Sequence, residues 1–481
     1  MKDRSLNRIL LAALFFHVFA AYFSSGFHHF DEHFQITEWL NFKNGGISGG
    51  DLAWEYREKI RPWFQVFAYN GIYTLFSTLG VQSPFIHLFI LRLFTSLFGL
   101  YSLFCFYPII KKWFNEDTRK SEFAFMLMTL AWYVPYIFVR TSSESFGLSF
   151  FLLGTSLFLR LNSFKKQILY SLLAGLFFGL SYQARFQMAA MVAPLWFYAL
   201  FTKQVSYRNC ALVALGVLFG IGSGLYFDLW GYGVWNFSLW HYFRTNFLEG
   251  IMQNVQQYPF WWYIRLAFNR GIPPVSLPLI LAMIFGWWKY RKHPLTWMTL
   301  PLFLFHSWVG HKELRYLFPI IIFAPLYLSF LIFDYREKFD FLQSKMWGRG
   351  LIKFVVGINI LFLVISTFRP ANPSVNFYKY LWKTPKIKKI YAHVEDPFFM
   401  LGLPIKFYKR SDLQVEIFED LTKLGDLKGR YLFFRKGKDL MTFENIPNCE
   451  LLYLTYPRFS LNYNIGNWLS RSRVWSLFHC H

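Results

Sequence analysis

The chain has 481 residues, of which 55% are hydrophobic and 22% aromatic, and its mean hydropathy is +0.28. Only 16% of the residues are charged, whereas a soluble protein usually has about 25%. This composition excludes an ordinary soluble protein, and apolar runs of roughly 18 to 25 residues favour a polytopic helical membrane protein. Much of the net charge of +23 lies in short loops between these runs, which is the positive-inside pattern and not a nucleic-acid-binding surface.

The first apolar run, residues 9–27, follows a basic tail, which predicts a retained membrane anchor with a cytoplasmic N-terminus. Residues 28–84 then form the first outer loop, in which we expect interfacial helices, including one near residues 63–79. In all we expect about eleven transmembrane helices, the other ten near residues 85–110, 121–139, 145–160, 167–184, 187–202, 209–227, 272–288, 294–310, 316–333 and 351–368. The expected cytoplasmic loops are all basic, and this topology puts the C-terminus on the outer face.

The composition changes after Arg369-Pro370. Short alternating runs at residues 414–417 and 431–434 are typical of β-strands, so residues 370–481 are expected to form a small α/β domain on the outer face. The cysteines show no motif spacing: two lie in or beside apolar runs, where we expect packing roles, and two lie near the C-terminus, where they can pair in an oxidising compartment. They are Cys105, Cys210, Cys449 and Cys480.

Directly after the first span, residues 28–35 read His-His-Phe-Asp-Glu-His-Phe-Gln. So many ionisable side chains at a membrane boundary are costly to desolvate, which indicates proton transfer, metal ligation or ion passage. Apolar residues at helical spacing over 36–43 place Asp31 and Glu32 at the N-terminus of a surface helix, where the dipole favours an ionised carboxylate suited to general-base catalysis. The ligand types also suit Zn or Mn, but the spacing is not His-Glu-x-x-His, so metal binding is the alternative interpretation.

A second group of charges, residues 311–319, reads His-Lys-Glu-Leu-Arg-Tyr-Leu-Phe-Pro at the expected outer junction of two late spans. Lys312 and Arg315 can contact phosphate oxygens, and His311 can add a hydrogen bond. Bases on the outer face run against topology selection, so as a set they indicate a bound anion, although snorkelling to the interface is the alternative for each. The set includes Arg140 and Arg185, and Arg92 lies within the second expected span, where a guanidinium is expensive.

Residues 29–35 resemble the His-Pro-Asp-Glu-x-x-Gln element of the GT-C class, family 22 glycosyltransferases, which include lipid-linked-oligosaccharide and glycosylphosphatidylinositol mannosyltransferases. Residues 311–319 are similar to the family's His-Lys-Glu-x-Arg-Phe-x-x-Pro element, and residues 140–145 to its Arg-Thr-x-Ser-Asn-x element. Asp228 with Tyr232-Gly233 echoes an Asp-x-x-x-Tyr-Gly stretch. Phe30 and Glu144 depart from the usual Pro and Asn, and the eukaryotic enzymes' Cys-His-rich element is not visible around residues 391–410.

The resemblance implies an all-α polytopic GT-C catalytic domain over residues 1–369, followed by the outer-face α/β domain over residues 370–481. It implies inverting transfer of a hexose, mannose above all, from a polyprenyl- or dolichyl-phosphate donor to a glycan or glycolipid acceptor on the outer face. Asp31 is then the expected general base, and Glu32 orients the acceptor or shares that role. The residues expected at the donor phosphate are Arg92, Arg140, His311, Lys312 and Arg315; those expected at the acceptor or sugar are His29, Gln35, Glu144, Asp228 and Tyr232.

We expect no cofactor, because protein cations suffice to stabilise a departing lipid phosphate; a divalent metal is the alternative. The partners expected are the lipid-linked donor, the acceptor and membrane lipids, without nucleic acid. A proton-coupled transporter or a flippase for lipid-linked sugars is the alternative function, but transporters usually show paired repeats with broken helices near the bilayer midplane. The short N-terminal tail and the divergent motifs favour a bacterial inner membrane, with the endoplasmic reticulum membrane as the alternative.

Overall fold

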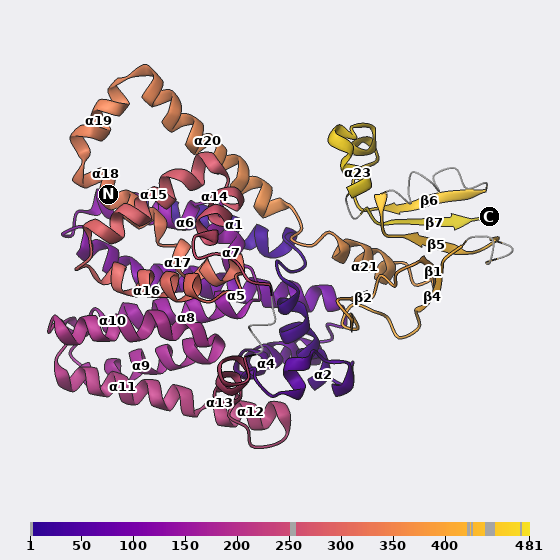
Figure 1. The fold of residues 1–481 in the computed structure, drawn as a ribbon, viewed down its shortest axis with the longest axis horizontal. Helices are drawn as coiled ribbons and strands as arrows, with labels where there is room; N and C mark the ends of the chain where they lie inside the picture. Colours follow the sequence, from indigo (N-terminus) through magenta and orange to yellow (C-terminus); the bar gives the residue numbers. More distant parts are fainter. Residues whose placement is uncertain (1–2, 251–255, 421–423, 425–426, 438–447, 472–473) are drawn as a thin grey trace. The chain divides into compact units, whose positions relative to one another are not determined.

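The computed structural model describes residues 3–250, 256–420, 424, 427–437, 448–471 and 474–481. The described part is mostly helical, with a five-stranded sheet near the C-terminus (Figure 1). The chain divides into two compact units. Unit 1 comprises Met1–Ser24, Trp54–Leu79 and Phe89–Arg369, and unit 2 comprises Ser25–Ala53, Gly80–Leu88 and Pro370–His481.

Unit 2 takes in residues 370–481 together with two earlier segments, Ser25–Ala53 and Gly80–Leu88. The residues that follow the first span therefore belong with the sheet and not with the helical unit. One local reason is a backbone connection, since the amide of Ala371 donates to the carbonyl of Ser25 at 2.8 Å. Beside it, Gly26 has φ +89°, and a Cβ there would lie 2.8 Å from Cβ of Asn372, so this close approach needs glycine.

Helices make up unit 1, and each expected span coincides with one or two of them. The helices are α1 (Asp3–Phe23), α3 (Trp54–Arg57), α4 (Phe64–Thr78), α5 (Pro84–Trp113, which begins in unit 2), α6 (Thr118–Leu130), α7 (Tyr133–Phe138), α8 (Ser143–Phe158), α9 (Gln167–Ala184), α10 (Ala189–Phe201), α11 (Tyr207–Gly222), α12 (Gly224–Tyr232), α13 (Ser238–Phe243), α14 (Trp262–Arg270), α15 (Pro273–Lys289), α16 (Pro294–Trp308), α17 (Phe318–Ile321), α18 (Ala324–Asp334), α19 (Arg336–Ser344) and α20 (Met346–Phe368). Short 3-10 or π turns connect some of them: η3 (Leu161–Ser163), η4 (Phe186–Met188), η5 (Arg244–Leu248) and η7 (Leu314–Leu317).

Within the described residues, four helical segments are long and apolar enough to cross a membrane. They are Arg4–Phe23, Pro84–Trp113, Tyr207–Tyr232 and Met346–Phe368. The pair Leu314–Ile321 and Ala324–Asp334, bent by 43°, makes a fifth if it is counted as one span. These segments support a polytopic membrane protein. The larger total of about eleven spans stays a prediction, because the other helices at expected positions are shorter or less apolar.

The closest helix pairing in unit 1 joins α9 and α11, which run side by side (Figure 1). Gly175 and Gly179 of α9 face Gly216 and Gly220 of α11, and a Cβ added to Gly179 would lie 2.8 Å from Cα of Gly220. In each helix the two glycines are four residues apart, about one turn, so they share a face. This is the small-xxx-small pattern that lets two backbones touch where lipid supplies no hydrophobic driving force.

Unit 2 contains the sheet together with short helices. Strand order is β4-β1-β5-β7-β6, with β1 parallel to β4 and β5, and β7 antiparallel to β5 and β6. The strands predicted near residues 414–417 and 431–434 are β4 and β5, so a small sheet domain is present as expected. The elements are η1 (Glu32–Thr37), α2 (Glu38–Lys43), η2 (Gly49–Asp51), α21 (Ser374–Lys383), β1 (Lys389–His393), β2 (Phe399–Met400), β3 (Leu403–Pro404), β4 (Gln414–Phe418), β5 (Tyr431–Phe434), β6 (Cys449–Leu454), η9 (Arg458–Asn462), η10 (Ile465–Asn467), α23 (Trp468–Arg471) and β7 (Ser476–Cys480).

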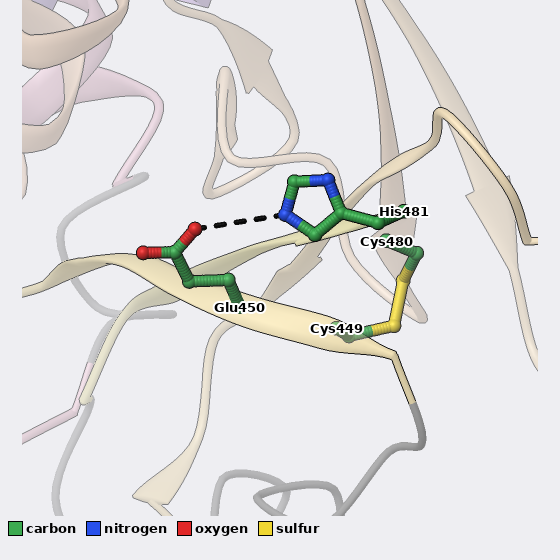
Figure 2. Close-up of a disulfide and its surroundings, with 4 residues drawn as sticks. All are labelled: Cys449, Glu450, Cys480 and His481. Carbon is green, nitrogen blue, oxygen red and sulfur yellow. Dashed lines mark ion pairs between the residues drawn. A yellow bond between two sulfur atoms is a disulfide. The ribbon is translucent and has the colours of Figure 1, made fainter.

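A disulfide joins the two antiparallel strands β6 and β7 (Figure 2). Cys449 and Cys480 lie directly opposite each other in the register, with their Cα atoms 3.9 Å apart. Beside it, Nε2 of His481 lies 3.6 Å from Oε2 of Glu450, on an exposed surface (Figure 2). The pairing predicted for an oxidising compartment is thus formed, and Cys105 and Cys210 are free, as expected.

Candidate functional site

Glu32 fixes the backbone of the acidic segment, which we define as residues 28–35. Its Oε1 accepts the backbone amides of His28 at 3.0 Å and His29 at 3.4 Å, while its own amide donates to the carbonyl of His29 at 3.1 Å. The residue is 2% exposed. A carboxylate that accepts amides at the start of a helix satisfies donors that would otherwise be buried unpaired, so Glu32 stabilises the turn that precedes η1.

Asp31 is the more accessible carboxylate of the pair, since its side chain is 13% exposed. Its amide donates to Nδ1 of His29 at 3.3 Å, and its Oδ1 lies 3.5 Å from the same ring nitrogen. The imidazole therefore orients the residue without covering it fully. Of the two acidic side chains, Asp31 is thus the more exposed, whereas Glu32 accepts backbone amides; the role of Asp31 as a general base stays a prediction.

The helix predicted over residues 36–43 is present, but it begins with a π-helical turn, η1, before α2. The hydroxyl of Thr37 donates to the carbonyl of Glu32 at 3.2 Å within that turn. Trp39 and Leu40 are fully buried and Gln35 is 5% exposed. Protein therefore covers this apolar face, and the expected position of the helix at the membrane surface stays a prediction. Wide π turns are frequent at functional sites, since they redirect side chains within a helix.

In unit 1, Glu144 stands between two arginines. Nη2 of Arg185 lies 3.0 Å and Nη1 of Arg315 lies 3.7 Å from Oε1 of Glu144, and all three side chains are at most 5% exposed. Glu144 belongs to the first turn of α8, where the helix dipole favours a negative charge. The glutamate that departs from the family-like motif is thus the counter-charge of two buried guanidiniums.

Glu313 extends this arrangement to the second motif. Its carboxylate pairs with Nε of Arg315 and, at 2.8 Å, with Nε2 of His311. The Tyr316 ring packs against both guanidiniums, with its centroid 5.3 Å from Cζ of Arg185 and 5.4 Å from Cζ of Arg315. We call Glu144, Arg185, His311, Glu313 and Arg315 the basic cluster. The sequence placed Arg185 only in the general set of outer-face bases and assigned no role to Glu313; the available signal for Glu313 was a glutamate inside the motif.

Lys312 occupies the C-terminal end of α16. Its Nζ donates to the carbonyls of Ser307 at 2.8 Å and His306 at 3.4 Å, and also to that of Val309, and the residue is 3% exposed. A lysine that binds the last carbonyls of a helix satisfies their unpaired acceptors and the negative dipole end. Burial lowers the pKa of Lys312 below its ordinary value of 10.5. The Lys312 ammonium therefore loses its proton at a lower pH than the neighbouring guanidiniums do.

Arg92 and Arg140 both bind the C-terminal end of α1. Nε of Arg92 donates to the carbonyl of Ala21 at 2.9 Å. Nη2 of Arg140 donates to the carbonyl of Ser24 at 2.5 Å and to its hydroxyl at 2.9 Å, and Arg140 is fully buried. The structure brings these two residues together at a helix end, where the unpaired carbonyls attract cations. Their expected contact with a donor phosphate stays a prediction.

Asp228 and Tyr232, both in α12, form hydrogen bonds that connect this helix to residues 61–63 and, through Asp228, to Ser238. Asp228 accepts the amide and hydroxyl of Ser238 at 2.9 and 2.6 Å and the amide of Trp63 at 3.2 Å. The hydroxyl of Tyr232 donates to the carbonyl of Arg61 at 2.8 Å. Asp228 is 2% exposed, so in this structure the two residues anchor the chain near residues 61–63. A direct contact with sugar or acceptor stays a prediction.

In the part of the chain that the structure describes, no three His, Cys, Asp or Glu side chains lie close enough to hold a metal ion. The histidines of the acidic segment point to different partners instead. His29 contacts Asp31, whereas His33 is 1% exposed and its ring stacks with that of Tyr408. The alternative of metal ligation by this segment thus finds no grouped ligand set among the described residues.

Comparisons with known proteins connect these features to one family. Residues 8–404 match the sequence model of the Alg9-like mannosyltransferase family. One similar protein is GPI alpha-1,2-mannosyltransferase 3 of Danio rerio, 24% identical over 289 residues that make up 58% of this chain and 51% of the relative. The protein of the same name from Xenopus laevis is 23% identical over 368 residues, or 73% of this chain and 63% of the relative. The matches thus span between half and two thirds of these relatives' own length.

Among solved structures, ArnT from Cupriavidus metallidurans bound to undecaprenyl phosphate has a similar fold. The TM-score is 0.55 at 11% identity, and the alignment covers 99% of this chain and 98% of ArnT. At so low an identity the likeness concerns the fold alone. It supports the GT-C architecture over almost the entire length of the chain, the C-terminal region included.

Proposed function

Because this chain belongs to the Alg9-like mannosyltransferase family, we propose that it transfers a hexose, mannose above all, from a lipid-phosphate donor to a glycan or glycolipid acceptor. Two relatives are named GPI alpha-1,2-mannosyltransferases, which supports mannose and a glycolipid acceptor. The ArnT structure was solved with undecaprenyl phosphate, which supports a polyprenyl-phosphate type of carrier. We propose that the reaction takes place on the outer face of the membrane, where the topology predicted from the basic loops would put both motifs.

The observation that carries this proposal is the difference between the two carboxylates of the acidic segment. Asp31 is partly exposed and oriented by His29, while Glu32 is buried against backbone amides. We assign the general base to Asp31: it takes the proton of the acceptor hydroxyl as that oxygen attacks the anomeric carbon. The bond from that carbon to the phosphate oxygen breaks, and the lipid phosphate leaves with inversion. Glu32 supports this base indirectly, because it accepts the His28 and His29 amides and so stabilises the turn that contains Asp31.

Cations are needed where the leaving phosphate gains charge. We propose Arg315, His311 and Lys312 for this role, because they come from one motif and are held by carboxylates or carbonyls in fixed positions. Arg185 joins them through the carboxylate that it shares with Arg315. For Arg92 and Arg140 we propose an indirect contribution at the donor phosphate, because both bind carbonyls at the C-terminal end of α1. Because protein cations suffice to balance a phosphate monoester, we propose a reaction without a cofactor, and chelator treatment tests this.

For the acceptor and sugar we propose His29 and Gln35 in the acidic segment, with Glu144 contributing through the basic cluster. Asp228 and Tyr232 contribute indirectly, by fixing the backbone near residues 61–63. As for the membrane, the relatives named above come from a fish and a frog, so they give no support to a bacterial inner membrane.

The test is product formation by the purified full-length protein in detergent, supplied with a radiolabelled polyprenyl-phosphate mannose and a glycolipid acceptor. Glycosylated acceptor formed without a sealed membrane is chemistry, which a transporter or flippase does not perform. The Asp31→Asn variant is expected to lose activity by a factor on the order of 10² to 10⁴, the usual contribution of a general base. The matched control is Asp117→Asn, which changes a surface carboxylate that caps α6. Wild-type activity in Asp31→Asn would remove Asp31 as the base.

A further inference from the structure

A second buried carboxylate lies six residues beyond Glu32, at the start of α2. Glu38 is 1% exposed. Its Oε1 accepts the backbone amides of Lys406 at 2.8 Å and Phe407 at 3.0 Å, and its Oε2 accepts Nδ2 of Asn41 at 2.9 Å. Burying a carboxylate is costly unless hydrogen bonds satisfy it, and here both oxygens are satisfied. Glu38 therefore holds the 405–408 loop, more than 360 residues away in the sequence, against its own helix.

His33 strengthens the same junction. Its Nε2 lies 2.9 Å from Oε1 of Glu38, and its ring lies between those of Phe27, at a centroid distance of 5.5 Å, and Tyr408, at 5.4 Å. The Tyr408 ring in turn stacks on that of Tyr378 in α21, at 5.4 Å. The π turn that begins directly after Asp31 thus lies between a polar contact to Glu38 and an aromatic contact to Tyr408, and both contacts lead to the C-terminal part of unit 2.

A surface ion pair joins the same loop by a different route. Nζ of Lys406 lies 2.7 Å from Oδ2 of Asp51, with side chains 41% and 37% exposed. Exposed pairs of this kind contribute little, because water and salt screen them. The buried Glu38 contacts are therefore the part of the junction that holds the helix, and the Asp51 pair offers a natural comparison.

We propose that Glu38 is a positioning residue for the transfer reaction. Its carboxylate couples the π turn that follows Asp31 to the 405–408 loop, so that the C-terminal region sets the position of the base. This inference rests on the proposed function of Asp31, and it assigns a task to the sheet-containing region that the sequence left without one. Reacting groups must be placed within a fraction of an ångström, and a shift of about 1 Å costs roughly 100-fold in rate.

The experiment compares Glu38→Ala, Glu38→Gln and Asp51→Asn in the full-length protein. Glu38→Ala is expected to lower kcat about 100-fold while KM for the polyprenyl-phosphate mannose donor stays nearly unchanged, because donor-phosphate cations are untouched. Glu38→Gln keeps an oxygen for the two amides, and the Asn41 amide can turn to match it, so kcat recovers to within about tenfold of wild type. Asp51→Asn leaves both constants unchanged.

Hydrogen exchange shows whether the contact itself was lost. The amides of residues 405–408 are expected to exchange faster in Glu38→Ala and at the wild-type rate in Asp51→Asn, while protection of β1 and β5 persists in both. A folded Glu38→Ala variant with wild-type kcat overturns the inference. A folded Glu38→Gln variant that is as slow as Glu38→Ala also overturns it, since the acceptor oxygen that glutamine retains would then not restore kcat.

Asp31→Asn, measured in parallel, separates the two proposals. If Asp31→Asn is inactive while Glu38→Ala is fully active, only the positioning inference fails. If Asp31→Asn keeps wild-type activity, the assignment of the base fails, and the effect of Glu38 must then be sought elsewhere. Either result identifies which of the two statements is wrong.

Discussion

Arg185 and Glu144 form a buried ion pair, with Nη2 and Oε1 3.0 Å apart and side chains that are 5% and 1% exposed. Arg315 approaches the same carboxylate oxygen at 3.7 Å. Two guanidiniums so far from water are tolerated because carboxylates compensate them: Glu144 lies beside both, and Glu313 also pairs with Arg315. The glutamate that replaces the usual asparagine of the family-like motif is therefore required by the charges around it.

Replacing this carboxylate should be costly. In Glu144→Gln both arginines keep their charge; Arg185 loses this carboxylate, whereas Arg315 keeps that of Glu313. Breaking a buried pair usually costs about 3–5 kcal/mol. We expect a lower unfolding temperature in detergent and reduced transfer activity. In the double variant Arg185→Met/Glu144→Gln the loss should be smaller than the sum of the two single losses, because the stranded Arg185 charge is gone. Additive losses would contradict the shared-carboxylate arrangement.

The control for this prediction is an ion pair in solvent. Nζ of Lys389 lies 2.6 Å from Oε2 of Glu416 across β1 and β4, with side chains 41% and 51% exposed. Surface pairs contribute about 0–1 kcal/mol, so Lys389→Gln should leave the unfolding temperature almost unchanged in the same assay.

Substitutions of Asp31 and Glu32 should differ in their effects: the first should lower activity, and the second should mainly lower stability. Glu32→Gln weakens acceptance of the His28 and His29 amides, and loss of a helix-end acceptor typically costs about 1 kcal/mol, so its unfolding temperature falls while part of the activity remains. Asp31→Asn should leave the unfolding temperature unchanged and remove the activity. Thermal unfolding and transfer assays on the same preparations check this. The opposite assignment, with an active Asp31→Asn and a stable but inactive Glu32→Gln, would make Glu32 the base.

Much of the fold was predictable because its signals are local. Apolar runs and basic loops located every expected span on a helix, and alternation at residues 414–417 and 431–434 located β4 and β5. The interfacial position of residues 36–43 stays a prediction, because hydrophobic periodicity reports an apolar face but not whether lipid or protein covers it. Trp39 and Leu40 are buried by contacts that no local pattern encodes.

The sequence nominated candidate site residues, but the contacts of each one became visible only in the structure. The motifs identified Asp31, Glu144 and Arg315, but the difference between Asp31 and Glu32 depends on where the turn directs each side chain. Glu38 was outside every motif considered, and its partners lie at residues 406 and 407. Contacts over such a sequence separation leave no pattern in a single chain.

The glycine interface between α9 and α11 predicts a sharp packing defect. A Cβ on Gly175 would lie 2.1 Å from the carbonyl oxygen of Val213, and backbone atoms cannot move aside as a flexible side chain can. Gly175→Ala should therefore destabilise the protein by about 1–3 kcal/mol through overpacking, seen as a lower unfolding temperature. Gly222→Ala is the matched control at the end of α11, since nothing lies within 4 Å of its added Cβ. Equal effects of the two variants would contradict the close approach.

Lys312 makes a prediction about pH. Burial lowers the pKa of Lys312 below 10.5, so in the folded protein the ammonium loses its proton at a pH where an ordinary lysine keeps it. If this charge stabilises the leaving phosphate, kcat/KM should fall as the pH rises towards that lowered pKa. Over the same window the folded state binds fewer protons than the unfolded chain, so the contribution of Lys312 to the unfolding free energy rises with pH. Activity and stability should thus move in opposite directions.

Lys312→Arg tests the cause of this alkaline loss. Arginine stays protonated throughout the accessible range, so the variant should keep its kcat/KM at pH values where the wild type declines, even if the longer side chain lowers the value at neutral pH. The measurement is a pair of pH–rate profiles from pH 7 to the alkaline limit of the assay, with thermal unfolding recorded at each pH. An alkaline decline that persists unchanged in Lys312→Arg would assign it to another group and remove the Lys312 ammonium from transition-state stabilisation.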